Sequence, residues 1–183
     1  MTELKHIVFL TGFMGSGKST IGPRLARKID YDFRDLDKII EESEGASVPE
    51  IFRTQGESYF RESENRVLRK VSESGGRIVV ALGGGTLTSE KCRNIVRDYG
   101  VLVYLQVSPQ KVLERVGRNQ ERPMLLGPGG EVLSGVDLAA RVESLLSDRE
   151  KYYLNADFVV NATEMTVTEC VEEIASKLKG SIE

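Results

Sequence analysis

Short apolar runs alternate along this chain with longer segments in which apolar residues recur at helical spacing. We interpret the short runs as strands and place them at residues 6–10, 31–34, 77–82, 101–107 and 157–161. Regular alternation of strands with helices is typical of a parallel sheet that carries helices on both faces. The pattern therefore predicts an α/β fold.

Three of the expected helices have recognisable first residues. Ser47 and Thr166 are each followed three residues later by a glutamate, which is the spacing of a capping box. Ser108 precedes a proline, a residue favoured at the first position of a helix. The glycine-rich stretch LLGPGGEVLSG, residues 125–135, instead indicates a mobile loop.

The segment LTGFMGSGKSTIG, residues 10–22, carries the pattern G-x-x-x-x-G-K-[ST] between an expected strand and an expected helix. Its glycines let successive backbone N–H groups point into one concavity, and the following helix adds the positive end of its dipole. Lys18 would supply charge to the outer phosphates, and the Ser19 hydroxyl is suited to ligate Mg²⁺. We therefore expect a nucleotide to be bound by Gly15, Ser16, Gly17, Lys18, Ser19 and Thr20.

This loop alone leaves the reaction open, because GTPases, motor ATPases, transporters and small-molecule kinases share it. The chain has no N-K-x-D guanine signature, and the apolar strand at 77–82 runs into glycines instead of an acidic residue. Asp35 and Asp37 follow the second strand. They either converge on magnesium and a substrate hydroxyl, or serve the next helix as its N-cap and a first-turn acid.

Several arginines stand where they could hold an anionic acceptor. Arg61 has Glu64 three residues on, on the same face of an expected helix, whereas Arg122 precedes the glycine-rich loop and Arg149 falls late in a further helix. Each of them alone is better explained as a solvated surface residue. Together they would suit a small acid, because guanidinium groups bind carboxylates and phosphates through permanently charged, bidentate forks.

Composition and charge limit the kinds of protein that this chain can be. The 183 residues, 40% of them hydrophobic, suit one domain, 1–183, and the net charge of −3 provides no basic field for nucleic acid. No apolar run is long enough to span a membrane and no secretory signal is present, so we expect a cytoplasmic protein. Cys92 and Cys170 are expected to be buried thiols, and the lack of heptads favours a monomer.

The segments GFMGSGKSTIG, DLDKIIEE, SVPEIFRTQGESYFRESE, VVALGGGT and ERPML occur in this order along nearly the whole chain. Through them the sequence resembles the shikimate kinases, members of the nucleoside monophosphate kinase-like group. The resemblance implies a three-layer sandwich with a five-stranded parallel sheet in the order 2-3-1-4-5. It also implies a substrate-binding segment at about 34–62 and a lid at about 117–135.

The reaction that the resemblance implies moves the γ-phosphoryl group of ATP to the 3-hydroxyl of shikimate with Mg²⁺, toward chorismate and the aromatic amino acids. Asp37 would bind the reacting hydroxyl, and Asp35 would reach magnesium through water. Arg61 and Arg149 would bind the shikimate carboxylate. The backbone would approach the substrate ring closely at Gly83, Gly84 and Gly85.

Further roles follow from the same resemblance. Lys18, Asp37 and Arg122 would be catalytic, with Arg122 moving from the lid onto the transferred phosphate. Glu64 would steady Arg61, and Arg115 would lie against adenine, where the loop NATEMT at 161–166 could add contacts.

Two departures from the family pattern bear on the site. Met124 replaces a leucine, a tolerant change in an apolar contact, and the interval from Arg122 to Arg149 is longer than in compact members. Two alternatives stay open: a gluconate kinase-like enzyme, and a catalytically silent binding protein of the same fold. The triple glycine and Arg61 argue against the first alternative. The second is opposed by the presence of Lys18, Asp37, Arg61 and Arg122.

Overall fold

The computed structural model describes residues 6–116, 123–127 and 129–182. All of the expected strands are present, and their ends differ from the predicted ones by at most one residue. They are β1 Ile7–Thr11, β2 Asp32–Asp35, β3 Ile78–Ala81, β4 Gly100–Gln106 and β5 Phe158–Asn161.

The strands form one five-stranded sheet in the order β2-β3-β1-β4-β5, and every neighbouring pair is parallel. This confirms the predicted fold and strand order. β1 lies at the centre and is buried over its whole length. Strands covered on both faces need apolar residues at successive positions, and β1, β3 and most of β4 have them.

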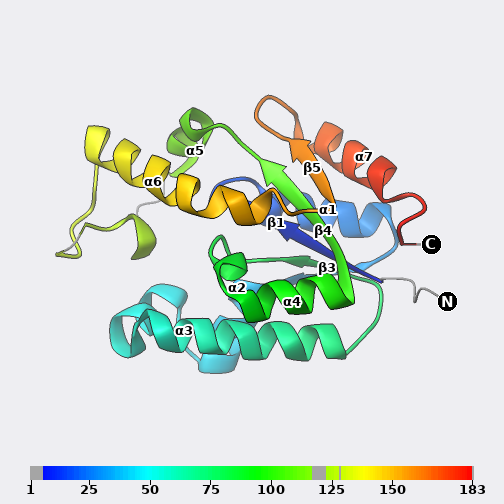
Figure 1. The fold of residues 1–183 in the computed structure, drawn as a ribbon, viewed down its shortest axis with the longest axis horizontal. Helices are drawn as coiled ribbons and strands as arrows, with labels where there is room; N and C mark the ends of the chain where they lie inside the picture. The colour runs from blue at the N-terminus through cyan, green and yellow to red at the C-terminus, as the bar shows by residue number, and fades with distance from the viewer. Residues whose placement is uncertain (1–5, 117–122, 128, 183) are drawn as a thin grey trace.

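Helices cover both faces of this sheet (Figure 1). On one side α1 packs with α7, and on the other α3 packs with α4, while α5 and α6 lie together near β4 and β5. The helices are α1 Lys18–Lys28, α2 Leu36–Glu44, α3 Val48–Glu73, α4 Glu90–Tyr99, α5 Pro109–Val116, α6 Gly135–Tyr153 and α7 Val167–Leu178, with 3-10 turns η1 Thr86–Thr88 and η2 Pro123–Leu125.

The predicted helix starts are found where the sequence placed them. Thr166 forms a complete capping box, and the Ser108 hydroxyl accepts a hydrogen bond from the third residue of α5. At α3 the Ser47 hydroxyl accepts from the Glu50 N–H at 3.4 Å. A second N–H of that helix end, on Val48, donates to the Glu41 carboxylate of α2 at 2.8 Å, which joins the two helices.

α3 is two helical segments joined at a bend. Gly56 has φ 84° and ψ 170°, a conformation that only glycine adopts without strain. The bend lets the rings of Phe52 and Phe60, on either side of it, approach to 4.8 Å between centroids. Both rings then contribute to the wall of one cavity.

The expected buried thiols are also found, since Cys92 and Cys170 are free and buried. Within the residues that the structure covers, no helix combines the length and apolar character that crossing a membrane requires. The carboxyl ends of all five strands lie at one edge of the sheet, because the strands are parallel. In open α/β sheets this edge is where ligands bind.

The contact between α1 and β2 depends on a missing side chain. A Cβ atom at Gly22 would lie 2.2 Å from the ring of Phe33. We expect Gly22→Ala to destabilise the fold by about 1–3 kcal/mol, because overpacking must be relieved by movement of helix or strand. Urea denaturation measures this, and adding Phe33→Leu should restore part of the loss. A Gly22→Ala protein as stable as the wild type would contradict the expectation.

Candidate active site

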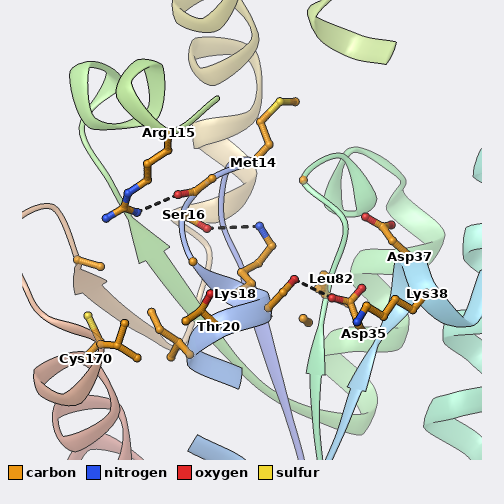
Figure 2. A pocket seen from close by; sticks show the side chains of 18 of the residues that line it. Met14, Ser16, Lys18, Thr20, Asp35, Asp37, Lys38, Leu82, Arg115 and Cys170 are labelled. Atoms are coloured by element: carbon orange, nitrogen blue, oxygen red, sulfur yellow. Dashed lines mark hydrogen bonds between the residues drawn. The ribbon is translucent and has the colours of Figure 1, made fainter. Parts of the chain in front are cut away.

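The phosphate-binding loop connects β1 to α1 and has the conformation its glycines allow. Gly17, the N-cap of α1, has φ 101°, in the left-handed region. The Lys18 ammonium reaches back along the loop and donates to the carbonyl oxygens of Gly12 and Phe13 at 2.7 and 3.1 Å. It also contacts the Ser16 hydroxyl at 3.3 Å (Figure 2). The loop therefore places the ammonium group beside the N-terminus of α1.

Asp35 combines parts of both interpretations made from the sequence. It is the N-cap residue of α2, but its side chain makes no capping hydrogen bond. Its carboxylate accepts a hydrogen bond from the Ser19 hydroxyl of α1 at 2.7 Å. A hydroxyl and a carboxylate side by side are the hard oxygen donors that Mg²⁺ prefers, usually together with water and phosphate oxygens. These two residues fit a magnesium ion.

Asp37 lies in the first turn of α2 and faces the sheet edge. Its Oδ1 atom is buried and has no hydrogen-bond partner among the described residues. Burial, with Glu64 and Asp35 nearby, raises the pKa of Asp37 to about 6, although Lys18 opposes the rise. A buried carboxylate oxygen without a partner is costly, and a ligand that donates a hydrogen bond there would relieve the cost.

Arg61 and Glu64 of α3 form a fixed ion pair. Arg61 Nη1 donates to Glu64 Oε2 at 2.8 Å, and its other nitrogens donate to Glu57 at 3.2 and 3.3 Å. The opposite oxygen of Glu64 accepts from the Thr86 hydroxyl at 2.5 Å. Glu64 and Thr86 are fully buried, so their hydrogen bond fixes the Glu64 carboxylate. The fixed carboxylate in turn holds the Arg61 guanidinium in one orientation.

The glycines at 83–85 allow these side chains to approach the loop. A Cβ atom at Gly83 would lie 2.9 Å from Asp37 Oδ1 and 2.9 Å from Glu64 Oε1. A Cβ atom at Gly85 would lie 2.4 Å from the Arg61 guanidinium. Glycine at these two positions therefore leaves space for the side chains of Asp37, Glu64 and Arg61.

Two cavities meet at this edge of the sheet. The larger, of about 720 Å³, is lined by the phosphate-binding loop, Asp35, Lys38, Arg115 and parts of the 162–170 segment. The smaller, of about 230 Å³, is lined by Arg61, Arg149, the 83–85 loop and the bend of α3. Both include Met14, Asp37, Glu41 and Gly84 in their walls.

Of the three arginines still to be placed, two line the cavities and one lies outside the described residues. Arg115 lines the larger cavity, and its Nη1 donates to the carbonyl oxygen of Gly15 at 2.8 Å (Figure 2). Arg149 is 5% exposed and lines the smaller cavity, so the longer interval before it does not displace it. Arg122 and residues 117–121, the first part of the expected lid, lie outside the described residues. The following Pro123 and Met124 line the smaller cavity.

The chain is similar to proteins of known function. A family profile described as shikimate kinase matches residues 14–179. A shikimate kinase of Chlorobaculum tepidum is 41% identical over 181 residues, which cover 98% of this chain and 94% of that protein. The chain belongs to the shikimate kinase family.

Solved structures of other shikimate kinases share the whole fold. One from Acinetobacter baumannii, in complex with shikimate, gives a TM-score of 0.87 at 29% identity and covers 97% of this chain and 94% of that one. One from Bacteroides thetaiotaomicron gives 0.85 at 31% identity, covering 94% and 98%. A gluconokinase from Sinorhizobium meliloti, at 19% identity and TM-score 0.56 over 96% and 93% of the two chains, shares the fold alone.

Some lining residues of this shikimate kinase family member were not predicted from the sequence. Most of them are apolar, and the others are charged residues of a helix: Met14, Lys38, Glu41, Phe52, Phe60, Val167 and Cys170. An apolar side chain in a cavity wall has the same sequence periodicity as one in the core, so no local signal separates them. Glu41 alone carried a signal, because it lies one turn after Asp37 on the same helix face.

The raised pKa of Asp37 has a consequence for stability. The native pKa of about 6 exceeds the ordinary value of 3.8, so ionised Asp37 costs native-state stability above pH 6, and the cost disappears as the pH falls toward 4. We expect Asp37→Asn to stabilise the magnesium-free protein by on the order of 2 kcal/mol at pH 8 and to lose this advantage near pH 4.

Urea denaturation across this pH range, without divalent cations, measures the effect. Asp98→Asn is the matched control, because the Asp98 side chain is 59% exposed. An advantage of Asp37→Asn that grew toward acid pH would contradict the assignment.

Proposed function

We propose that this protein transfers the γ-phosphoryl group of ATP to the 3-hydroxyl group of shikimate, giving ADP and shikimate 3-phosphate. One observation carries the proposal: a cavity walled by a phosphate-binding loop adjoins a cavity walled by two arginines, and the unpartnered Asp37 Oδ1 lies where they meet. Such a pair of cavities suits a phosphoryl donor and an acidic acceptor with a hydroxyl at the junction. Membership of the shikimate kinase family supports the same reaction.

The larger cavity is the proposed ATP site. The N–H groups of residues 15–20 and the ammonium group of Lys18 would bind the β- and γ-phosphates at the N-terminus of α1. Arg115 would lie against the adenine, with Ala162 and Met165 of the 161–166 loop nearby in the same wall. Mg²⁺, held by Ser19 and through water by Asp35, would neutralise charge on the phosphates.

The smaller cavity is the proposed shikimate site. Arg61 and Arg149 would bind the carboxylate, since each guanidinium offers a bidentate fork. The 83–85 backbone would contact the ring. Asp37 would accept the hydrogen bond of the reacting hydroxyl and orient its oxygen toward the γ-phosphate.

Phosphoryl transfer demands positioning and charge neutralisation more than acid–base chemistry. Lys18, in the phosphate-binding loop, would neutralise charge on the transferred phosphoryl group. Arg122, in the lid at about 117–135, would do the same from the lid side. Lid closure would also keep water from the γ-phosphate. The segment at about 34–62, which supplies Asp37 and Arg61, would form the acceptor-binding part of a single domain.

Two competing functions are less well supported. A gluconate kinase would be expected to have a different acceptor pocket, whereas here two arginines, Glu64 and the glycine loop form one wall. A silent binding protein would be expected to have lost Lys18, Asp37 or Arg61. We further propose a cytoplasmic monomer without nucleic-acid partners, consistent with the net charge of −3.

The direct test is an assay of ADP release with shikimate, gluconate and a panel of nucleoside monophosphates as acceptors. We expect shikimate alone to give rapid turnover, which depends on Mg²⁺. Asp37→Asn should lower kcat at least about 100-fold, in the range typical of a lost catalytic carboxylate. Turnover with another acceptor but not with shikimate would refute the proposed substrate, and an unchanged kcat would refute the role of Asp37.

Arg61→Lys tests carboxylate binding. Lysine keeps the charge but loses the bidentate fork and its fixed pairing with Glu64, so we expect KM for shikimate to rise about 10- to 100-fold. KM for ATP should stay within about twofold, because Arg61 is absent from the wall of the larger cavity. Steady-state kinetics with each substrate varied measure both.

The matched control is Arg66→Lys. Arg66 lies on the same helix and pairs with Glu44 at 2.7 Å, but its side chain is 58% exposed. Its replacement should leave both KM values unchanged. An Arg61→Lys enzyme with raised KM for ATP and unchanged KM for shikimate would contradict the assignment of the smaller cavity.

A further inference from the structure

Tyr153, the last residue of α6, is a buried polar side chain to which the reaction described above assigns no role. The residue is 1% exposed, and its hydroxyl donates a hydrogen bond to the carbonyl oxygen of Gly84. The two residues are far apart in sequence, so the bond joins α6 to the glycine loop. A buried hydroxyl of this kind is costly unless it is paired, and the geometry pairs it with one backbone atom.

Gly84 lines both cavities, so a shift of its backbone would change the shape of both. A Cβ atom at this position would lie 3.4 Å from the Met14 nitrogen and 3.6 Å from Arg149 Nη1. A side chain at this position would therefore contact both the phosphate-binding loop and α6. A small rotation of the peptide at Gly84 would alter the wall of the acceptor cavity.

Arg149 precedes Tyr153 by one helical turn on the same face of α6. Burial raises the pKa of the Tyr153 phenol to about 12, while the charge and hydrogen bonding of Arg149 oppose the rise. The phenol is therefore protonated at neutral pH and remains a donor to Gly84. The guanidinium of Arg149 also lies over the Phe13 ring at 5.9 Å, so it is held between the loop and the tyrosine.

The ring of Tyr153 is fixed independently of its hydroxyl. It packs on Tyr104 of β4 with ring centroids 5.1 Å apart. Because this packing involves only the rings, the hydroxyl can be removed with the least disturbance of the core. The pair of rings thus offers both a test residue and a control residue.

We propose that Tyr153 is a positioning residue for acceptor binding: its hydroxyl ties the Arg149 turn of α6 to the carbonyl oxygen of Gly84. Through this bond the guanidinium of Arg149 and the glycine loop keep one fixed spacing across the acceptor cavity. The inference rests on the proposed function only for the identity of the acceptor.

The first experiment is Tyr153→Phe, which removes the hydroxyl and keeps the ring. We expect KM for shikimate to rise about tenfold, equivalent to about 1.4 kcal/mol, with KM for ATP within about twofold of the wild-type value. Tyr104→Phe, which removes the other hydroxyl of the ring pair and leaves the Tyr153–Gly84 bond in place, should change neither value. In an Arg149→Lys background, Tyr153→Phe should raise KM less than it does alone, because the two residues act together.

A second measurement does not depend on the substrate. The Arg149 Nε–H resonance of the ligand-free protein should move or broaden in Tyr153→Phe and not in Tyr104→Phe. An unchanged resonance, an unchanged KM for shikimate, or an equal loss for both substrates would overturn the inference. Failure of the wild type to phosphorylate shikimate would instead refute the proposed function, and the resonance comparison would still decide the role of Tyr153.

Discussion

The absence of side chains at residues 83–85 is the constraint on which the arrangement of the site depends. A Cβ atom at Gly83 would collide with the carboxylates of Asp37 and Glu64, and one at Gly85 would collide with the Arg61 guanidinium. These charged groups come from two different helices, α2 and α3. Glycine is the one residue type that lets those helices converge on a single loop. Gly84 of this loop lines both cavities, so the loop forms part of their shared wall.

This convergence has an electrostatic cost. Asp37 is buried beside Glu64 and Asp35, and the ammonium group of Lys18 offsets only part of the effect on its pKa. Glu64 itself is stabilised by Arg61 and Thr86, whereas one oxygen of Asp37 has no such partner among the described residues. An energetic cost at one buried, unpaired atom is expected where function, and not stability, determines the residue.

The sequence predicted the fold well because its signals are local. Strand ends, helix caps and the phosphate-binding loop each depend on a few neighbouring residues. The acceptor residues were assigned through the motifs of a known family, and the structure brings Asp37, Arg61 and Arg149 to one cavity. The bond from Tyr153 to Gly84 and the cavity role of Cys170 depend on contacts between distant segments, and no spacing in the chain reports them.

The shared wall of the two cavities also matters for inhibitor chemistry. Met14, Asp37, Glu41 and Gly84 border both spaces, so the two cavities adjoin along these residues. A single compound could therefore extend from one cavity into the other. Its linker would pass the carboxyl groups of Asp37 and Glu41 and would gain from carrying a hydrogen-bond donor toward the unpartnered Asp37 Oδ1.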